Sequence, residues 1–274
     1  MRALLCLAAA VCALSSWAFP LPVTAAQNRP LRVLPLGDSI TAGIVGNGGE
    51  PSGGYRKLLE QLLAVAPHRA VLVGSRTDFS PGLTDPDHDG YPGYVIRATS
   101  PGAPGQLYGS LVRAAIERTH PDVILLMLGT NDFLRYEGSG GTYSVDTMVQ
   151  SMDLLLGEIF QTAPRVHVIL GAIVNSPKVD PCYVERFDTG RSTCDSGAHP
   201  SLAGLVSKYS REGRAISYAP GFFGVLPRDL KHFPDGIHPI AGPQGYDALA
   251  HLWYEAIERG AQTTADVKEP HLQR

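Results

Sequence analysis

The chain has 274 residues, of which 44% are hydrophobic and 18% are charged, and its formal net charge at pH 7 is −3. This composition is typical of a globular protein with enough apolar residues for one large core. The charge is mildly acidic and no basic stripe is visible, so we expect nucleic acid not to be a partner.

The first 25 residues have the pattern of a secretory signal peptide. Arg2 gives a short positive start, and residues 3–14 form an apolar stretch that is too short to span a bilayer. Small residues follow at Ala18 and at 23–26, and either place fits a cleavage site. An uncleaved anchor is the alternative, which the lack of a longer apolar run disfavours. We therefore expect a secreted, extracellular protein with no membrane partner.

Short apolar runs alternate with helical patterns after residue 30, as in folds whose parallel strands are joined by crossover helices. Five runs are predicted to be strands: 31–36, 70–74, 122–128, 166–171 and 215–218. The third run is apolar from Val123 to Leu128, which is typical of a strand covered on both faces.

Apolar residues also recur at helical spacing, which predicts core-facing helices. The helical stripes lie at 55–63, 145–160 and 246–257. Ser144 stands where it can cap the second helix. The elements together form one predicted domain, residues 27–262, and the polar, unpatterned residues 263–274 are expected to be a tail.

Two cysteines, Cys182 and Cys194, lie outside the predicted signal peptide. In a secreted chain such a pair most simply forms a disulfide. On the chain-entropy view it would add about 3 kcal/mol to the free energy of unfolding. A metal pair is the alternative, but no further ligands stand at useful spacing.

Three motifs bring polar side chains to strand ends or helix starts. Gly37-Asp38-Ser39 follows the first predicted strand, and Gly129-Thr130-Asn131-Asp132 follows the third. Asp235-Gly236-Ile237-His238-Pro239 precedes the last helix. Because ligands of open parallel sheets bind outside the carboxyl ends of the strands, the three motifs can share one edge of the sheet.

The residue types in these motifs fit hydrolysis by an activated serine. Ser39 is the predicted nucleophile, His238 its base and Asp235 the group that orients the base. The predicted oxyanion donors are the backbone N–H groups of Ser39 and Gly93 and the side-chain amide of Asn131. Each motif alone also fits a turn or a helix entry, so the prediction depends on their combination and order. No cofactor or metal is expected.

Together the motifs resemble the sequence blocks of the SGNH, or GDSL, hydrolases. The four blocks are 35–41, 90–94, 129–132 and 235–239. With Gly53-Gly54-Tyr55-Arg56 and Leu252-Trp253-Tyr254, the chain is most similar to the acetylxylan esterases of carbohydrate esterase family 3. The resemblance implies an α/β fold, a three-layer α/β/α sandwich with a flavodoxin-like sheet of five parallel strands. The second block departs from the family pattern, because it reads His88-Asp89-Gly90 where we expect His-Glu-Gly.

We expect a monomeric, secreted serine esterase, and the resemblance implies that it removes O-acetyl groups from xylan or a related plant polysaccharide or oligosaccharide. A short-chain acyl esterase or lysophospholipase is the alternative enzyme, because esterases of sugars, lipids and thioesters share these blocks. A catalytically silent, carbohydrate-binding SGNH domain is the alternative of another class. A damaged triad would favour it, and here every element of the triad is present.

Other features near the motifs have less specific interpretations. Residues 85–90 resemble the first half of a calcium loop, but Ile96 stands where an EF-hand has its closing Glu. We interpret the run as a solvated acidic turn, and a weak calcium site of another geometry stays open. The aromatic rings near the motifs fit either packing or a sugar contact: Tyr55, Tyr91 and Tyr94. His232 and the other histidines outside the motifs are interpreted as surface or packing residues without a matching partner.

Overall fold

The computed structural model describes residues 29–67, 69–98, 105–136, 144–194 and 196–266. The predicted signal peptide, residues 1–25, lies outside the described residues. The last helix, α8 (Tyr246–Asp266), includes residues 263–266, so the first part of the predicted tail is helical. The rest of that tail, residues 267–274, also lies outside the described part.

A parallel sheet forms the centre of the molecule, and it contains all five predicted strands. They are β1 (Leu31–Gly37), β2 (Ala70–Leu72), β4 (Val123–Met127), β5 (His167–Gly171) and β6 (Ile216–Ala219). Their order is β2-β1-β4-β5-β6. A two-residue strand that the sequence did not predict, β3 (Asp89–Gly90), pairs with the end of β1. The strand order reverses at β1, and sheets of this kind bind ligands at such a switch point, here the carboxyl ends of β1 and β4.

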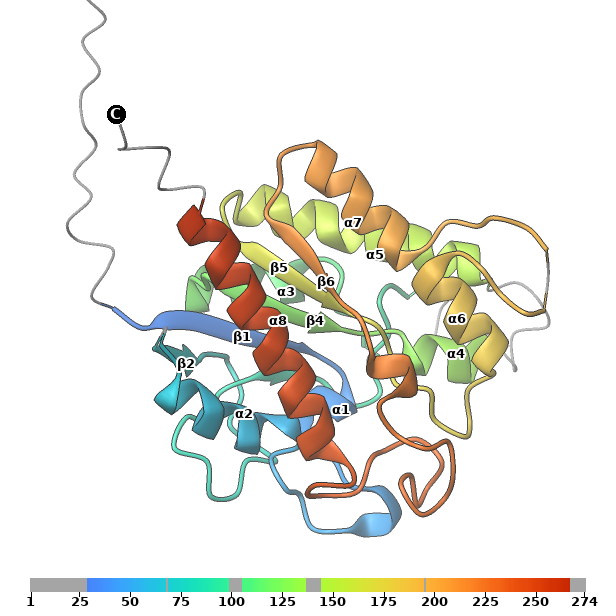
Figure 1. Cartoon of the computed structure of the whole chain (residues 1–274), viewed down its shortest axis with the longest axis horizontal. Helices are drawn as coiled ribbons and strands as arrows, with labels where there is room; N and C mark the ends of the chain where they lie inside the picture. The colour runs from blue at the N-terminus through green and yellow to red at the C-terminus, as the bar shows by residue number, and fades with distance from the viewer. Residues whose placement is uncertain (1–28, 68, 99–104, 137–143, 195, 267–274) are drawn as a thin grey trace, which may run out of the picture.

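Helices cover both faces of this sheet, which confirms the three-layer α/β sandwich (Figure 1). Helices α2 (Tyr55–Val65) and α8 lie on one face. The other face is covered by α3 (Ser110–Thr119), α5 (Val145–Thr162), α6 (Pro181–Thr189) and α7 (Leu202–Arg211). Two short helices, α1 (Ser39–Ala42) and α4 (Thr130–Tyr136), begin at the carboxyl ends of β1 and β4.

Strand β4 shows how the sequence produces this layering. Ile124 and Leu126 pack in the core on the α5 side, whereas Leu125 and Met127 pack in the core on the α8 side. Every residue of the strand is buried, as its apolar sequence predicted. The predicted cap of α5 is also present, because Ser144 Oγ accepts a hydrogen bond from the N–H of Thr147 at 3.2 Å.

A disulfide joins Cys182 in α6 to Cys194, with their Cα atoms 5.7 Å apart, as predicted. In the described part of the chain, these cysteines and Asp180 are the only group of three side chains close enough to share a metal ion. Since both sulfur atoms belong to the disulfide, they are not thiolate ligands.

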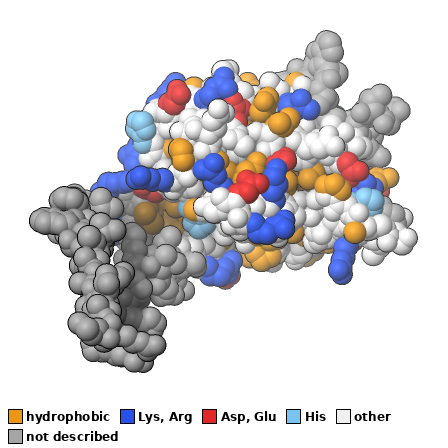
Figure 2. All heavy atoms as spheres, turned by 90° about the horizontal axis from the view of Figure 1, so that it is seen from above, with side chains coloured by type: hydrophobic (Ala, Val, Ile, Leu, Met, Phe, Trp, Pro, Cys, Tyr) orange, Lys and Arg blue, Asp and Glu red, His pale blue; other side chains and the backbone are white. Residues whose placement is uncertain are grey.

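The surface carries charges of both signs. On the face drawn in Figure 2, Lys and Arg side chains alternate with Asp and Glu side chains and with small apolar areas. None of the helices within the described ranges has the length and apolar character needed to cross a membrane.

Candidate active site

Ser39 is the first residue of α1 and directly follows the turn that ends β1. The carboxylate of Asp38 caps this helix, accepting a hydrogen bond from the N–H of Ile40 at 2.9 Å. The turn needs glycine at position 37, because a Cβ there would lie 2.4 Å from both Met127 O and Thr41 Oγ1. The serine is 6% exposed and is therefore largely covered by its neighbours.

The Asp-x-x-His turn places His238 against this serine. Asp235 Oδ1 accepts hydrogen bonds from the N–H groups of Ile237 and His238, and Oδ2 lies 2.6 Å from His238 Nδ1. The other ring nitrogen, Nε2, lies 2.8 Å from Ser39 Oγ. Burial acts to raise the pKa of Asp235, but the hydrogen bonds from His238 and from the backbone outweigh it and lower the pKa. An ionised Asp235 can only accept, so Nδ1 carries the proton and Nε2 is free to accept from the serine.

The glycine-rich segment 45–54 forms a wall that lies against Asp235. A Cβ at Gly46 would come within 2.9 Å of the carboxyl carbon of Asp235. Asn47 donates a hydrogen bond from Nδ2 to Pro234 O at 2.9 Å. The segment 45–54 therefore packs against the Asp235 turn. Only glycine at position 46 leaves room for the Asp235 carboxylate.

Asn131 connects the block that contains Ser39 (residues 35–41, the serine block) to the block that contains Gly93 (residues 90–94, the glycine block). Its Nδ2 donates to Tyr94 O at 3.0 Å and lies 3.5 Å from Asp38 Oδ2, which is the outer limit of a hydrogen bond. Gly93 precedes Tyr94, is exposed, and has φ +78°, a conformation that favours glycine. A Cβ at Gly93 would meet no atom within 4 Å, so the space before its backbone is open. Asn131 thus lies between the residues that flank the other two predicted oxyanion donors, Ser39 and Gly93.

The aspartates beside these residues make structural hydrogen bonds. Asp132 is completely buried and accepts from the N–H of Ile96 at 3.1 Å. Asp38 is also buried, and burial raises its pKa to about 6 against the opposing effects of the Ile40 N–H and of His238.

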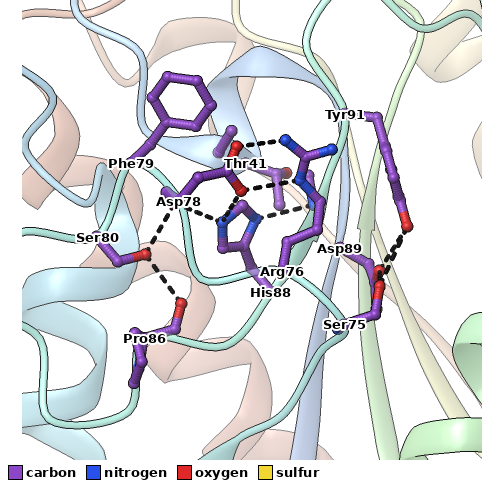
Figure 3. Close-up of polar contacts among 12 residues, drawn as sticks. Thr41, Ser75, Arg76, Asp78, Phe79, Ser80, Pro86, His88, Asp89 and Tyr91 are labelled. Carbon is purple, nitrogen blue, oxygen red and sulfur yellow. Dashed lines mark hydrogen bonds and ion pairs between the residues drawn. The ribbon is translucent and has the colours of Figure 1, made fainter.

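The acidic run before the glycine block is used for internal hydrogen bonds. Figure 3 shows Asp89 accepting from both Ser75 and Tyr91, and the Tyr91 hydroxyl lies 2.7 Å from the carboxylate. Within the described residues, the run brings no three acidic side chains close enough to share a calcium ion. Asp89 therefore anchors the start of the glycine block at the end of β1.

The tyrosines of the motifs are engaged in packing. Tyr55 is completely buried, with its ring centroid 5.9 Å from that of Trp253. Tyr91 is 7% exposed and stacks on Tyr94 at 5.1 Å between ring centroids. The Tyr94 ring also lies against Gly105, where a Cβ would come within 2.0 Å of it. Packing is therefore the role of Tyr55 and Tyr91, and neither offers a free face to a sugar.

The structure corrects the interpretation of His232, which does have an acidic partner. Its Nδ1 lies 2.7 Å from Asp229 Oδ1, again at a spacing of three residues. The sequence Asp229-Leu230-Lys231-His232 contained this signal, since it repeats the Asp-x-x-His spacing of Asp235 and His238. The local sequence pattern also indicates no role for Arg56, whose side chain is completely buried.

Comparisons with known proteins identify the fold and the family. A multidomain esterase from Ruminococcus flavefaciens is 28% identical over 250 residues, which are 83% of this chain and 28% of that protein. This chain thus spans less than a third of that relative. A family 3 carbohydrate esterase from Clostridium thermocellum has the same fold, with a TM-score of 0.63 and 22% identity over 86% of this chain and 99% of that one.

A second structure with this fold is a carbohydrate esterase of family 3 from Talaromyces cellulolyticus. Its TM-score is 0.57 and its identity 22%, over 88% of this chain and all of that one. The profile of the GDSL-like Lipase/Acylhydrolase family matches residues 36–248, a segment that contains Ser39, Gly93, Asn131 and the Asp-x-x-His turn. The chain belongs to this family of SGNH hydrolases.

Proposed function

We propose that this protein is a secreted serine esterase that removes O-acetyl groups from xylan or a related plant polysaccharide, with Ser39, His238 and Asp235 as its triad. The observation that carries the triad is the unbroken chain of contacts from Ser39 Oγ to His238 Nε2, 2.8 Å, and from His238 Nδ1 to Asp235 Oδ2, 2.6 Å. These distances are those required of a nucleophile, a base and the group that orients the base.

The reaction proceeds through an acyl-enzyme. Ser39 Oγ attacks the ester carbonyl while its proton moves to His238 Nε2, and Asp235 stabilises the resulting imidazolium. The bond between the acyl carbon and the sugar oxygen breaks, and the leaving sugar alkoxide takes the proton from His238 Nε2. A water molecule then attacks the acetyl-serine, giving its proton to Nε2, and acetate leaves as Ser39 regains its proton. The chain's own side chains supply every proton transfer.

The oxyanion is stabilised by the backbone N–H groups of Ser39 and Gly93 and by Asn131 Nδ2. One hydrogen of Asn131 Nδ2 is held by Tyr94 O, which fixes the amide plane, and the other makes only a 3.5 Å contact with Asp38. That second hydrogen is available to a developing negative charge. The open space before Gly93 lets a substrate oxygen approach the backbone.

The substrate class is supported by the relatives. Two of the matched folds are carbohydrate esterases of family 3, and a relative in sequence is a multidomain esterase. The family description also includes lipases, which supports a short-chain acyl esterase or lysophospholipase as the second candidate. A silent binding domain is disfavoured, because His238 lies within hydrogen-bond reach of both Ser39 and Asp235.

The test measures acetate release from acetylated xylan by the purified mature protein, together with hydrolysis of p-nitrophenyl esters of increasing acyl length. Ser39→Ala serves as the control. We expect acetate release by the wild type, a sharp fall in kcat/KM beyond short acyl chains, and loss of both activities in Ser39→Ala. Hydrolysis of long-chain esters without action on xylan would move the assignment to the lipid esterase. Undiminished activity of Ser39→Ala would overturn the triad.

A further inference from the structure

A buried cation lies directly behind the nucleophile helix. The side chain of Arg56, the second residue of α2, is completely buried. Its guanidinium donates hydrogen bonds to Thr41 O at 2.9 Å, Ala42 O at 2.9 Å, Phe79 O at 3.4 Å, Ser80 Oγ at 2.9 Å and Pro86 O at 3.0 Å. All these acceptors are neutral oxygens. A guanidinium has five N–H donors, so each one is used, which is what makes such burial tolerable.

Two of the acceptors are the last two carbonyl groups of the helix that carries Ser39. Helix α1 has four residues, and a helix of one turn cannot maintain itself because nucleation is unfavourable. The carbonyl groups at a helix end need external donors, and a positive charge is favourable at that end. Arg56 provides both to Thr41 and Ala42, while Asp38 caps the other end. The nucleophile is thus held by side chains from outside its helix.

The other acceptors belong to the loop that leads into the glycine block. Figure 3 shows Asp78, Ser80, Pro86 and His88 gathered beside Thr41. Burial lowers the pKa of His88 to about 4, so the ring is neutral at neutral pH. Its Nε2–H donates to Asp78 O at 2.7 Å, and its Nδ1 accepts from the N–H two residues later at 3.0 Å. The loop that Arg56 contacts is therefore tied to the start of the glycine block.

That block in turn lies on the nucleophile helix. A Cβ at Gly90 would come within 2.5 Å of Ala42 N, so the two backbones are in direct contact. The N–H of Tyr91 donates to Gly37 O at 2.9 Å, and Gly93 follows two residues later. One guanidinium thus connects, by hydrogen bonds and backbone contact, the helix of the nucleophile with the segment of the oxyanion glycine.

We propose that Arg56 is a positioning residue for ester hydrolysis, which fixes α1 with Ser39 relative to the segment 78–93 with Gly93. Arg56 does not touch the substrate. The proposal rests on the roles proposed above for Ser39 and Gly93. The positioning role makes a prediction that an ordinary core residue would not. Loss of the planar guanidinium of Arg56 should slow the chemical step without weakening substrate binding.

The first variant is Arg56→Lys, which keeps the charge but replaces a planar fork with a point donor that cannot reach both groups of acceptors. We expect kcat for p-nitrophenyl acetate to fall roughly 10- to 100-fold, as for small misplacements of reacting groups, with KM within about twofold. The rate at which a fluorophosphonate labels Ser39 should fall by the same factor. Arg32→Lys is the matched control, because Arg32 Nε donates to Thr119 O at 2.8 Å at the other end of β1.

A milder variant keeps the test decisive if Arg56→Lys does not fold. Ser80→Ala removes one acceptor of the guanidinium, and we expect kcat to fall severalfold with KM unchanged. Ser207→Ala, which removes a hydroxyl bonded to Ala203 O on α7, should have no effect. If Arg56→Lys folds and has the kcat and the labelling rate of the wild type, the positioning role of Arg56 is overturned. If Arg56→Lys is unfolded, the same result in Ser80→Ala would overturn it. An active Ser39→Ala would instead show that the triad assignment failed.

Discussion

The neutral, buried imidazole of His88 should make the stability of this protein depend on pH. In the folded state its pKa is about 4 because of burial, against about 6.5 for an unperturbed histidine. The folded state therefore binds fewer protons than the unfolded chain between these values. The stabilising contribution is complete above pH 6.5 and is lost as the pH falls towards 4.

The size of this effect follows from the two pKa values. Linkage gives a loss of about 2 kcal/mol in the free energy of unfolding at pH 5 and about 3 kcal/mol at pH 4, relative to pH 7. Asp38 acts in the opposite direction, because burial raises its pKa to about 6 and the folded state then gains stability as the pH falls. The wild-type profile alone therefore understates the contribution of His88.

A comparison of the wild type with a His88→Gln variant isolates the contribution of His88 to the pH dependence. His88→Gln keeps a side-chain donor of similar reach for Asp78 O but has no ionisable ring. We would measure the free energy of unfolding in urea for both proteins at pH 7, 6 and 5. The variant should be less stable than the wild type at pH 7. The difference between their free energies of unfolding should narrow by about 2 kcal/mol at pH 5. His251→Gln, which removes an exposed imidazole on α8, is the matched control and should leave the wild-type profile in place. A gap that stays constant from pH 7 to 5 would refute the account of His88.

Three further predictions concern the site and the disulfide. Asp235→Asn should lower kcat about 10⁴-fold with little change in KM, because the amide no longer fixes the tautomer of His238. Steady-state kinetics on p-nitrophenyl acetate would measure this, and a fall in kcat of less than about tenfold would contradict it. Asn131→Ala should lower kcat about 10²- to 10³-fold through loss of one oxyanion donor, and an unchanged kcat would exclude Asn131 from that role. Replacing Cys182 and Cys194 together by serine should lower the free energy of unfolding by about 3 kcal/mol and leave kcat intact, as urea unfolding and the same assay would show.

The apolar pattern of the chain was sufficient to predict five of the six strands of the sheet. Residues 123–128 are apolar throughout because both faces of β4 are covered, and that condition can be recognised in sequence. Strand β3 was missed for the opposite reason. Asp89 and Gly90 have no strand pattern, and they pair with β1 because of the tertiary contacts around them.

The role of Arg56 could not be predicted from local pattern. It stands next to the apolar stripe of α2, where a charged residue normally faces solvent. Its acceptors come from the end of α1 and from the loop at 79–86, which are distant in sequence. Burial of the guanidinium is thus a consequence of how the loop folds over α2, and only the three-dimensional structure reveals it.

The two Asp-x-x-His turns show what local sequence can and cannot specify. In both turns the aspartate Oδ1 accepts hydrogen bonds from backbone N–H groups two and three residues later, and the carboxylate lies within 2.7 Å of the ring Nδ1. The Asp229 side chain is 49% exposed, however, whereas that of Asp235 is 25% exposed and is enclosed by Gly46. Only His238 has its second nitrogen on Ser39. The spacing builds an oriented histidine in either place, and only the one beside Ser39, at the carboxyl end of β1, is placed to act as the proposed base.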